Sequence, residues 1–294
     1  MTTIFGISVP ALMGQLLIGL INGSFYALLS LGLAVIFGLL NIINFTHGAQ
    51  YMLGAFVAWF LLNKLGLGYW WALLLVPLAL AAFGMAIERF MLKHLYKLDH
   101  LYGLLLTFGL ALIVEGIFTN QFGSAGLPYS IPEKLGGGYN LGFMFLPAYR
   151  AWVIVASLAI CFGTWFVIER TKLGSYLRAA TENPPLVQAF GVNVPRMITL
   201  TYGFGVGLAG LAGVFAAPIY QVSPQMGSSL IIVVFAVVVI GGMGSIMGSI
   251  LTGFGLGIIE GLTKYFYPEA SSTVIFVIMA IVLMVRPQGL FGQR

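Results

Sequence analysis

Polar side chains that can bind or orient a small solute gather between two apolar stretches near the start of the chain. They are Asn41, Asn44, His47 and Gln50, and Asn44 and His47 share a helical face because they are three residues apart. Polar groups in such a place are costly unless they have partners. The cluster predicts the lining of a translocation path or a broken helix whose end meets a substrate. The alternatives are hydrogen bonds between helices and a cytoplasmic helix cap.

Two acidic residues fall inside other apolar stretches. Glu115 lies late in 101–119, and Glu260 lies late in 248–266. A carboxylate within a membrane span is by default a candidate functional group. Both residues are therefore candidates for the translocation path, and the alternatives are a position near the membrane surface or an ion pair with a basic residue.

A basic segment at 169–197 interrupts the apolar pattern and carries the signals of a folded element. Asn183 can cap a helix that starts with Pro184, and Gly191 can end that helix in a left-handed turn. We expect a short helix over 184–190, outside the membrane. Because this helix has no Lys or Arg, it is better suited to docking another protein than to resting on a lipid surface.

The remaining sequence indicates that these residues are held in a membrane. The chain is 60% hydrophobic and 7% charged, whereas a soluble domain is about 45–50% apolar and about 25% charged. Backbone groups in lipid need internal partners, which leaves helices or a closed barrel. Runs such as Leu28–Leu40 do not alternate as barrel strands do. We expect an all-α polytopic membrane protein with a single transmembrane domain over 1–294.

The number of crossings follows from the apolar stretches, since a span needs about 20 mainly apolar residues. The first stretch, 11–40, is too long for one simple span, and Asn22 and Gly23 mark a place where it can break. We expect eight to ten crossings. The stretches are 11–40, 44–63, 71–92, 101–119, 151–168, 198–217, 229–246, 248–266 and 273–286.

Orientation follows from Lys and Arg in short loops, which mark the cytoplasmic side of a bacterial inner membrane. One basic loop holds Arg89 and Lys93, and the segment 169–197 is the second. Two predicted spans separate these loops, so both are expected in the cytoplasm, together with the C-terminus. The connection 120–150 is then external.

Small residues recur at four-residue spacing along the chain. Gly253, Gly257 and Gly261 form such a series, which predicts close packing of one helix on another. Gly241–Gly242 and the nearby Gly244 predict a break in a helix.

Several kinds of chemistry are not indicated. The chain lacks the glycine-rich P-loop that ends in Lys and Ser or Thr, so it is not expected to bind ATP itself. With His47, His94 and His100 as its three histidines and Cys161 as its one cysteine, a metal site is not expected, and Cys161 is interpreted as a buried, inert thiol. The net charge of +5 is attributed to cytoplasmic loops rather than nucleic-acid binding. No catalytic residue is proposed.

At these residues the sequence resembles the membrane permease subunits of ABC importers for branched-chain amino acids, of the LivH type. The first motif is similar to the family's Ile-Asn-Phe-Ala-His-Gly signature and the Met-Leu-Gly-Ala that follows it, with Thr46 where alanine is common. The other motifs are similar to the family's coupling loop and closing pattern. The motifs are Asn41–Ala55, Arg170–Gly174, Arg178–Ala179, Glu182–Asn183, Gly191–Asn193, Gly241–Ser245 and Arg286–Leu290.

The resemblance implies a non-catalytic subunit of an importer that takes up leucine, isoleucine or valine. A paralogous second permease subunit, two cytoplasmic ATPase subunits that hold ATP and Mg, and a periplasmic binding protein would be its partners. The family's coupling helix corresponds to Glu182–Gly191. The residues implied in coupling to the ATPase are Arg178, Glu182, Asn183, Pro184, Gln188 and Gly191.

Three alternatives stay open from the sequence. Related permeases for urea, short amides or other amino acids share much of this pattern. A stand-alone carrier driven by an ion gradient would use Glu115, Glu260 or His47 as its proton or ion sites. A structural scaffold is disfavoured by the polar cluster and by the capped helix.

Overall fold

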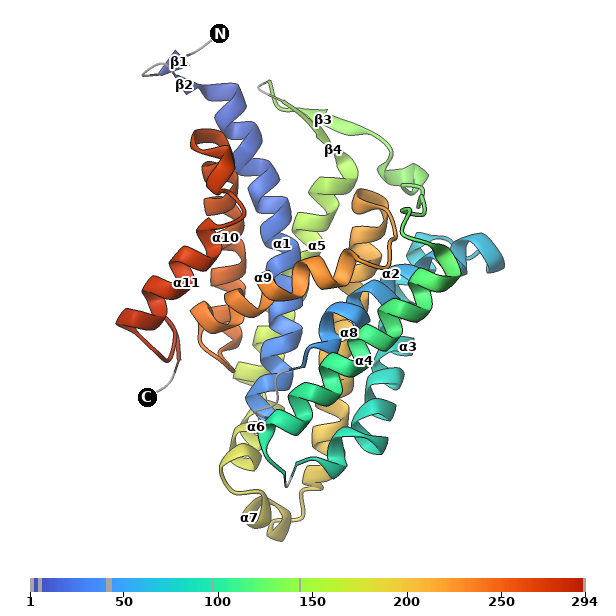
Figure 1. The fold of residues 1–294 in the computed structure, drawn as a ribbon, viewed down its shortest axis with the longest axis vertical. Coiled ribbons are helices and arrows are strands. Elements are labelled where there is room, and N and C mark those ends of the chain that lie inside the picture. Colours follow the sequence, from blue (N-terminus) through green and yellow to red (C-terminus); the bar gives the residue numbers. More distant parts are fainter. Residues whose placement is uncertain (1–2, 5–6, 41–43, 97, 143, 293–294) are drawn as a thin grey trace. The chain divides into compact units, whose positions relative to one another are not determined.

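The computed structural model describes residues 3–292 apart from 5–6, 41–43, 97 and 143, and almost all of its regular structure is helical (Figure 1). The longer helices are α1 (Val9–Leu40), α2 (Thr46–Leu65), α3 (Tyr69–Phe90), α4 (His100–Phe122), α5 (Ala148–Arg170), α6 (Lys172–Glu182), α8 (Val194–Tyr220), α9 (Met226–Gly241), α10 (Ile246–Phe266) and α11 (Val274–Val285). The short elements are α7 (Pro184–Ala189), η1 (Leu92–His94), η2 (Glu133–Leu135), η3 (Pro268–Ala270), β1 (Thr3–Ile4), β2 (Ile7–Ser8), β3 (Gly138–Asn140) and β4 (Phe145–Pro147).

The nine apolar stretches each correspond to one helix. In the part of the chain that the structure describes, six helices are long and apolar enough to cross a membrane, namely α1, α3, α4, α5, α8 and α10. Helices α9 and α11 are apolar but shorter, and α2 has 20 residues. The prediction of an all-α polytopic membrane protein is confirmed, while eight to ten crossings stay a prediction.

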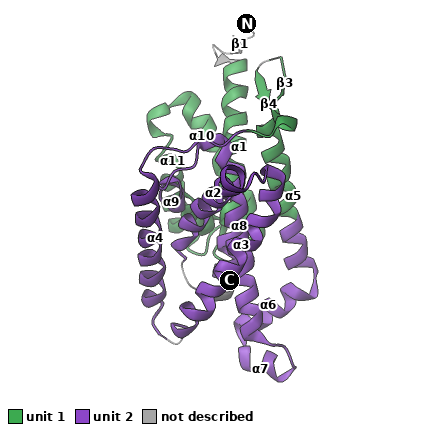
Figure 2. Cartoon of the chain, turned by 90° about the vertical axis from the view of Figure 1, so that its right-hand side faces the viewer, with its two compact units in different colours: residues 1–30, 131–162, 233–294 green, residues 31–130, 163–232 purple. Residues whose placement is uncertain are grey.

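The chain divides into two compact units (Figure 2). Three of the boundaries between them fall inside α1, α5 and α9, and the fourth falls in the connection between α4 and η2. Unit 1 comprises residues 1–30, 131–162 and 233–294, and unit 2 comprises residues 31–130 and 163–232. Each unit is described by itself. The single transmembrane domain expected over 1–294 stays a prediction.

In unit 2, α8 packs against α2 and α3, and glycines allow the backbones to come close. A Cβ atom placed on Gly54 of α2 would lie 2.3 Å from the carbonyl oxygen of Gly210 in α8. A Cβ atom placed on Gly213 would lie 2.2 Å from the carbonyl oxygen of Tyr51. The α2–α8 interface therefore has no room for a side chain at these points.

In unit 1, α10 packs in the same way against the first part of α1. A Cβ atom on Gly257 would lie 2.4 Å from the Cα atom of Gly23, and one on Gly261 would lie 2.4 Å from the carbonyl oxygen of Gln15. The predicted close packing is confirmed for Gly253, Gly257 and Gly261.

The expected break at Asn22 and Gly23 is wrong, because α1 is one helix of 32 residues. Gly23 instead faces α10, where a Cβ atom would lie 3.0 Å from the Cα atom of Phe254. In lipid an unbroken helix keeps every backbone hydrogen bond internal. A glycine in such a helix serves close approach rather than a bend.

The break predicted after Gly241 is confirmed. Helix α9 ends at Gly241, and both Gly242 and Gly244 have positive φ angles, of 100° and 84°. Glycine takes such angles without a steric cost from Cβ. Ser245 then caps α10 by accepting a hydrogen bond from the backbone N–H of Gly248.

Candidate functional site

The polar cluster at the start of α2 lies in the packed interior of unit 2. Asn44 donates from Nδ2 to Oε1 of Gln50 at 3.4 Å, and its Oδ1 accepts a hydrogen bond from the hydroxyl of Thr46. All three side chains are buried. The buried Tyr202 of α8 lies against the same three residues. Asn41 falls outside the described residues.

His47 is fully buried, and its ring lies directly against Gly32 of α1. A Cβ atom on Gly32 would lie 3.0 Å from Cε1 of His47 and 2.8 Å from the carbonyl oxygen of Gly205. The imidazole ring therefore occupies space that any other residue at position 32 would fill. Asn44, His47 and Gln50 belong to one buried region, as their spacing indicated, and their expected part in a translocation path stays a prediction.

A threonine from another helix supports the chain where α2 begins. The backbone N–H of Phe45 donates to the hydroxyl of Thr107 in α4 at 3.3 Å, and Thr107 donates to the carbonyl oxygen of Leu104 at 3.0 Å. Thr107 is fully buried. An irregular stretch inside an apolar bundle needs such a partner, and the sequence alone did not identify it.

Glu115 and Glu260 have different surroundings. Glu115 in α4 is partly exposed, and its Oε1 accepts a hydrogen bond from Ser228 of α9 at 3.3 Å. No described contact joins it to the Asn44–Gln50 cluster. Glu260, in unit 1, is 8% exposed, and its Oε2 accepts from the Tyr26 hydroxyl at 2.7 Å.

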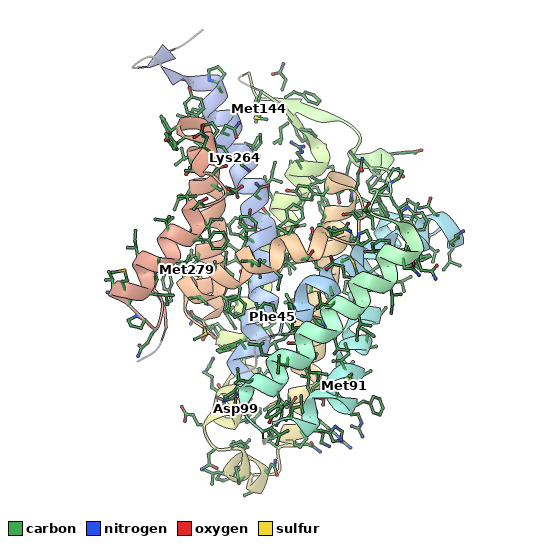
Figure 3. All side chains as sticks on the ribbon, in the orientation of Figure 1. Phe45, Met91, Asp99, Met144, Lys264 and Met279 are labelled. Atoms are coloured by element: carbon green, nitrogen blue, oxygen red, sulfur yellow. The ribbon has the colours of Figure 1, made fainter. Side chains whose placement is uncertain are left out.

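Glu260 also forms an ion pair with Lys264, one helical turn further along α10, at 2.6 Å (Figure 3). This is the ion pair with a basic residue that the sequence left open. Two partners satisfy a carboxylate that burial would otherwise penalise strongly. The arrangement fixes α10 against α1 through Tyr26.

We expect Lys264→Met to lower the stability of the protein more than Glu260→Gln does. The first change leaves a buried carboxylate without its cation, at a cost of about 1–3 kcal/mol, whereas the second removes the charge and keeps an acceptor for Tyr26. Thermal unfolding of the two variants in the same detergent measures the difference. If Lys264→Met unfolded at the wild-type temperature, the ion pair would have no structural role.

The segment 169–197 is a folded unit with two helices. Oδ1 of Asn183 accepts from the backbone N–H of Leu186 at 3.1 Å and caps α7, and Gly191 follows with a φ angle of 86°. The short helix, its cap and its left-handed end are thus confirmed. Helix α6 precedes it.

A small apolar core holds this segment together and fixes it to the start of α8. Its members come from α6, α7 and α8, and they are Leu177, Ala180, Val187, Val194 and Met197. Asn193 caps α8 by accepting from the backbone N–H of Arg196 at 3.1 Å. Any force on α7 therefore reaches α8 through packed side chains.

The outer face of the segment holds the residues that the resemblance assigns to coupling. Glu182, Pro184, Gln188 and Gly191 are exposed, and Asn183 is used by its cap. Arg178 is exposed as well, and it forms a 3.3 Å ion pair with Glu169 at the end of α5. An ion pair this exposed contributes little to stability.

Two large apolar side chains share that outer face. Leu186 is 53% exposed and Phe190 is 80% exposed. Both lie between the candidate spans Ala148–Arg170 and Val194–Tyr220, in the same folded segment as Glu182. Isolated exposed apolar residues are common, but Leu186 in α7 and Phe190 directly after its last residue form an anchor of the kind that binds a groove on a partner.

Comparison with known proteins assigns the family. The model of the family described as branched-chain amino acid transport system / permease component matches residues 15–283. The chain belongs to this family. The LivH-type resemblance of its motifs is thereby confirmed.

Individual members of this permease family match over most of their length. The permease protein BraD of the high-affinity branched-chain amino acid transport system of Pseudomonas aeruginosa is 30% identical, and the match covers 95% of each chain. LivH of Escherichia coli K12, named for the same kind of system, is 28% identical with the same coverage. No solved structure matches the chain significantly.

A second type of permease protein also matches this chain. LivM of Escherichia coli K12 carries the same description as LivH and is 30% identical, over 90% of this chain and 67% of its own length. One organism therefore has two permease proteins of this family that both resemble the chain. This agrees with the expected pairing of two paralogous permease subunits.

Proposed function

We propose that the protein is the transmembrane permease subunit of an ATP-driven importer for branched-chain amino acids in a bacterial inner membrane. Family membership supports the transport role, and the names of BraD and LivH support leucine, isoleucine and valine as the substrate class. The subunit carries no catalytic residue and no cofactor of its own. ATP and Mg are held by two cytoplasmic ATPase subunits.

The observation that best supports this proposal is the exposed outer face of α7, because it provides apolar side chains outside the spans to which a partner protein can bind. Leu186 and Phe190 supply the apolar contact, and Glu182 and Gln188 supply polar contacts around it. We infer that this face docks on an ATPase subunit. Movement of α7 then reaches α8 through the apolar core around Val187.

The proposed topology follows from the basic loops. Helices α4 and α5 lie between the loop with Arg89 and Lys93 and the segment with Arg178, so the two basic segments share the cytoplasmic side. The connection 120–150, with strands β3 and β4, faces outward and meets the binding protein. The six long helices together with α2, α9 and α11 make nine crossings, within the expected range of eight to ten. The C-terminus is cytoplasmic.

A stand-alone carrier is a weaker proposal. Both oxygens of the Glu260 carboxylate already have partners within unit 1, Lys264 for one and Tyr26 for the other. Substrate uptake by liposomes that contain this chain alone would nonetheless establish the carrier and overturn the importer.

We expect Glu182→Arg to weaken the coupling between the permease and its ATPase. Glu182 is the exposed last residue of α6 beside the cap of α7, so reversing its charge alters the docking face without touching a span. Binding-protein-stimulated hydrolysis and leucine uptake should fall about tenfold, which corresponds to roughly 1.4 kcal/mol of lost interaction. The measurement uses the complete complex in proteoliposomes, and unchanged uptake would contradict the assignment of this face.

The substrate class has its own test. Calorimetry on the cognate binding protein with leucine, other amino acids, urea and short amides shows which solute the system collects. Tight binding of leucine is expected. Binding of urea with none of leucine would replace the substrate and leave the permease role intact.

A further inference from the structure

One buried carboxylate lies outside the sites described so far. Glu88, near the end of α3, is 2% exposed. Its Oε1 accepts a hydrogen bond from the Tyr96 hydroxyl at 2.6 Å, and its Oε2 accepts one from the Thr199 hydroxyl at 2.5 Å. The three residues come from α3, from the connection after η1, and from the second turn of α8.

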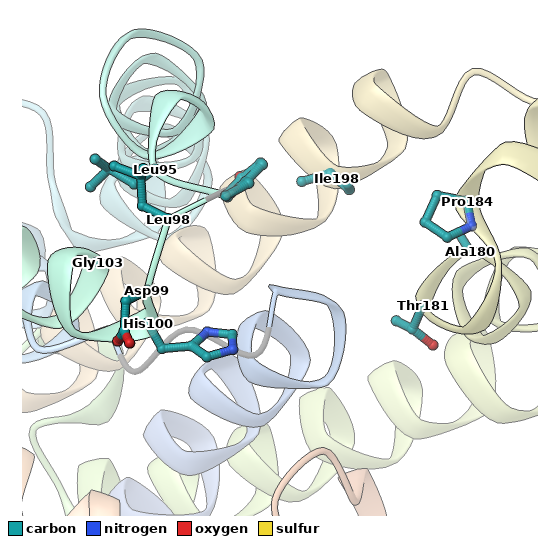
Figure 4. A pocket seen from close by; sticks show the side chains of 10 residues that line it. Leu95, Leu98, Asp99, His100, Gly103, Ala180, Thr181, Pro184 and Ile198 are labelled. Carbon is teal, nitrogen blue, oxygen red and sulfur yellow. The ribbon is translucent and has the colours of Figure 1, made fainter.

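Tyr96 has a second role at the same place, because it lines a cavity beside the segment 169–197. The cavity has a volume of about 240 Å³. One wall is the start of α4 with the connection before it, including Asp99 and His100 (Figure 4). The facing wall is formed by Ala180 and Pro184 of α6 and α7.

This space lies between α6 and α7 on one side and the α3–α4 connection on the other. Ile198 of α8 lines the cavity next to Thr199 in the chain. The two hydrogen bonds to Glu88 therefore sit directly behind the cavity, at the point where α8 leaves the segment. A loosely filled gap allows the segment to shift relative to the connection, and the carboxylate restrains that shift.

Glu88 also connects this end of unit 2 with the polar cluster at the start of α2. Tyr202 of α8 lies one turn beyond Thr199 and is within electrostatic range of both Glu88 and Tyr96. Tyr202 in turn lies against Asn44 and Gln50. Polar side chains thus extend from Thr199, two residues after the segment 169–197, to the start of α2.

Stability alone does not account for a carboxylate at this position. Removing a carboxylate from water is costly, and a well-packed apolar side chain usually holds helices together as well or better. What a carboxylate adds is two strong, directional hydrogen bonds to neutral donors. Such bonds fix the relative positions of three elements more narrowly than apolar contacts do.

We propose that Glu88 is a positioning residue that makes α3, the connection at Tyr96 and the start of α8 move as one piece when the segment 169–197 is displaced. The inference rests on the proposed function, because it adds one step to the proposed coupling between the ATPase and the permease. Without the two hydrogen bonds, displacement of the segment is absorbed in the cavity and does not reach α2.

The test compares variants that remove one hydrogen bond each. Tyr96→Phe and Thr199→Val delete one donor with little change of shape, and Glu88→Gln leaves one acceptor oxygen in place of two. In the complete complex, the amount of leucine transported per ATP hydrolysed should fall about fivefold, the usual size of coupling between contacting residues. Basal hydrolysis and the yield of assembled complex should stay at wild-type levels.

Two controls separate positioning from a general loss of structure. Thr199→Ser keeps the hydroxyl and should restore wild-type transport per ATP. Tyr102→Phe removes a hydroxyl from an exposed ring in α4 and should change nothing. In a double-mutant cycle, Tyr96→Phe with Thr199→Val should lose less than the sum of the single losses, because both donate to one carboxylate.

The outcomes keep this inference distinct from the proposed function. If the wild-type complex does not transport leucine, the proposed function fails. Suppose that the wild-type complex transports leucine. If the three variants then transport as much leucine per ATP as the wild type, or differ from it only in the yield of assembled complex, Glu88 is not a positioning residue. Only a loss of transport per ATP with assembly and basal hydrolysis retained agrees with the inference.

Discussion

We expect Gly54→Val to leave almost no folded protein in detergent extracts of the membrane. A Cβ atom at Gly54 would lie 2.3 Å from the carbonyl oxygen and 2.6 Å from the Cα atom of Gly210, so the side chain meets backbone that cannot move aside. Forcing extra atoms into a packed interior costs about 1–3 kcal/mol and sometimes more. Valine adds three carbon atoms where even one does not fit. We therefore expect the loss of stability to lie at the upper end of this range.

The matched control is Gly109→Val in α4. No atom lies within 4 Å of a Cβ placed on Gly109, and both glycines lie inside helices of unit 2. Thermal unfolding and size-exclusion profiles of the two variants are compared with the wild type. Gly109→Val should match the wild type, and equal behaviour of the two variants would contradict the close α2–α8 contact.

Features that depend on nearby residues could be predicted from the sequence. Asn183 directly precedes α7 and caps its first turn. Gly191 supplies the left-handed turn that ends this helix. Both signals act within a few residues of chain, so the sequence contains the whole interaction. The same holds for the helix break at Gly242 and Gly244.

Features that depend on residues distant in sequence could not be predicted. Glu260 was identified as a buried carboxylate, but its partner Tyr26 is 234 residues away. Glu88 stands beside Arg89 in the sequence, and nothing there brings Thr199, 111 residues later, to its side. A residue type can show that a partner is needed, whereas only packing shows which one it is.

Glycine in a membrane helix illustrates the same difficulty. Gly23 and Gly242 are both glycines next to apolar stretches. Helix α1 continues through Gly23, whereas α9 ends directly before Gly242. The first is placed against the α10 backbone, and that neighbour is 231 residues away in the sequence. Without it, the sequence suggested a break at Asn22 that does not exist.

The second large effect is expected at the docking face of α7. Phe190→Asp should abolish co-purification of the ATPase with the permease, because it places a charge where the proposed interface needs its apolar anchor. Phe190 is 80% exposed, so the substitution leaves the core around Val187 intact. Anchor residues of interfaces contribute about 2 kcal/mol or more, which weakens binding by at least about thirtyfold.

Tyr139→Asp provides the matched control for Phe190→Asp. Tyr139 lies in strand β3 and is 60% exposed, and the proposed topology puts it on the outer side of the membrane. It should keep the ATPase bound, since the ATPase never meets that side. If both variants retained the ATPase, α7 would not be the docking helix. If Tyr139→Asp alone released it, the proposed orientation of the chain would be reversed, and the basic loops with Arg89 and Arg178 would face outward.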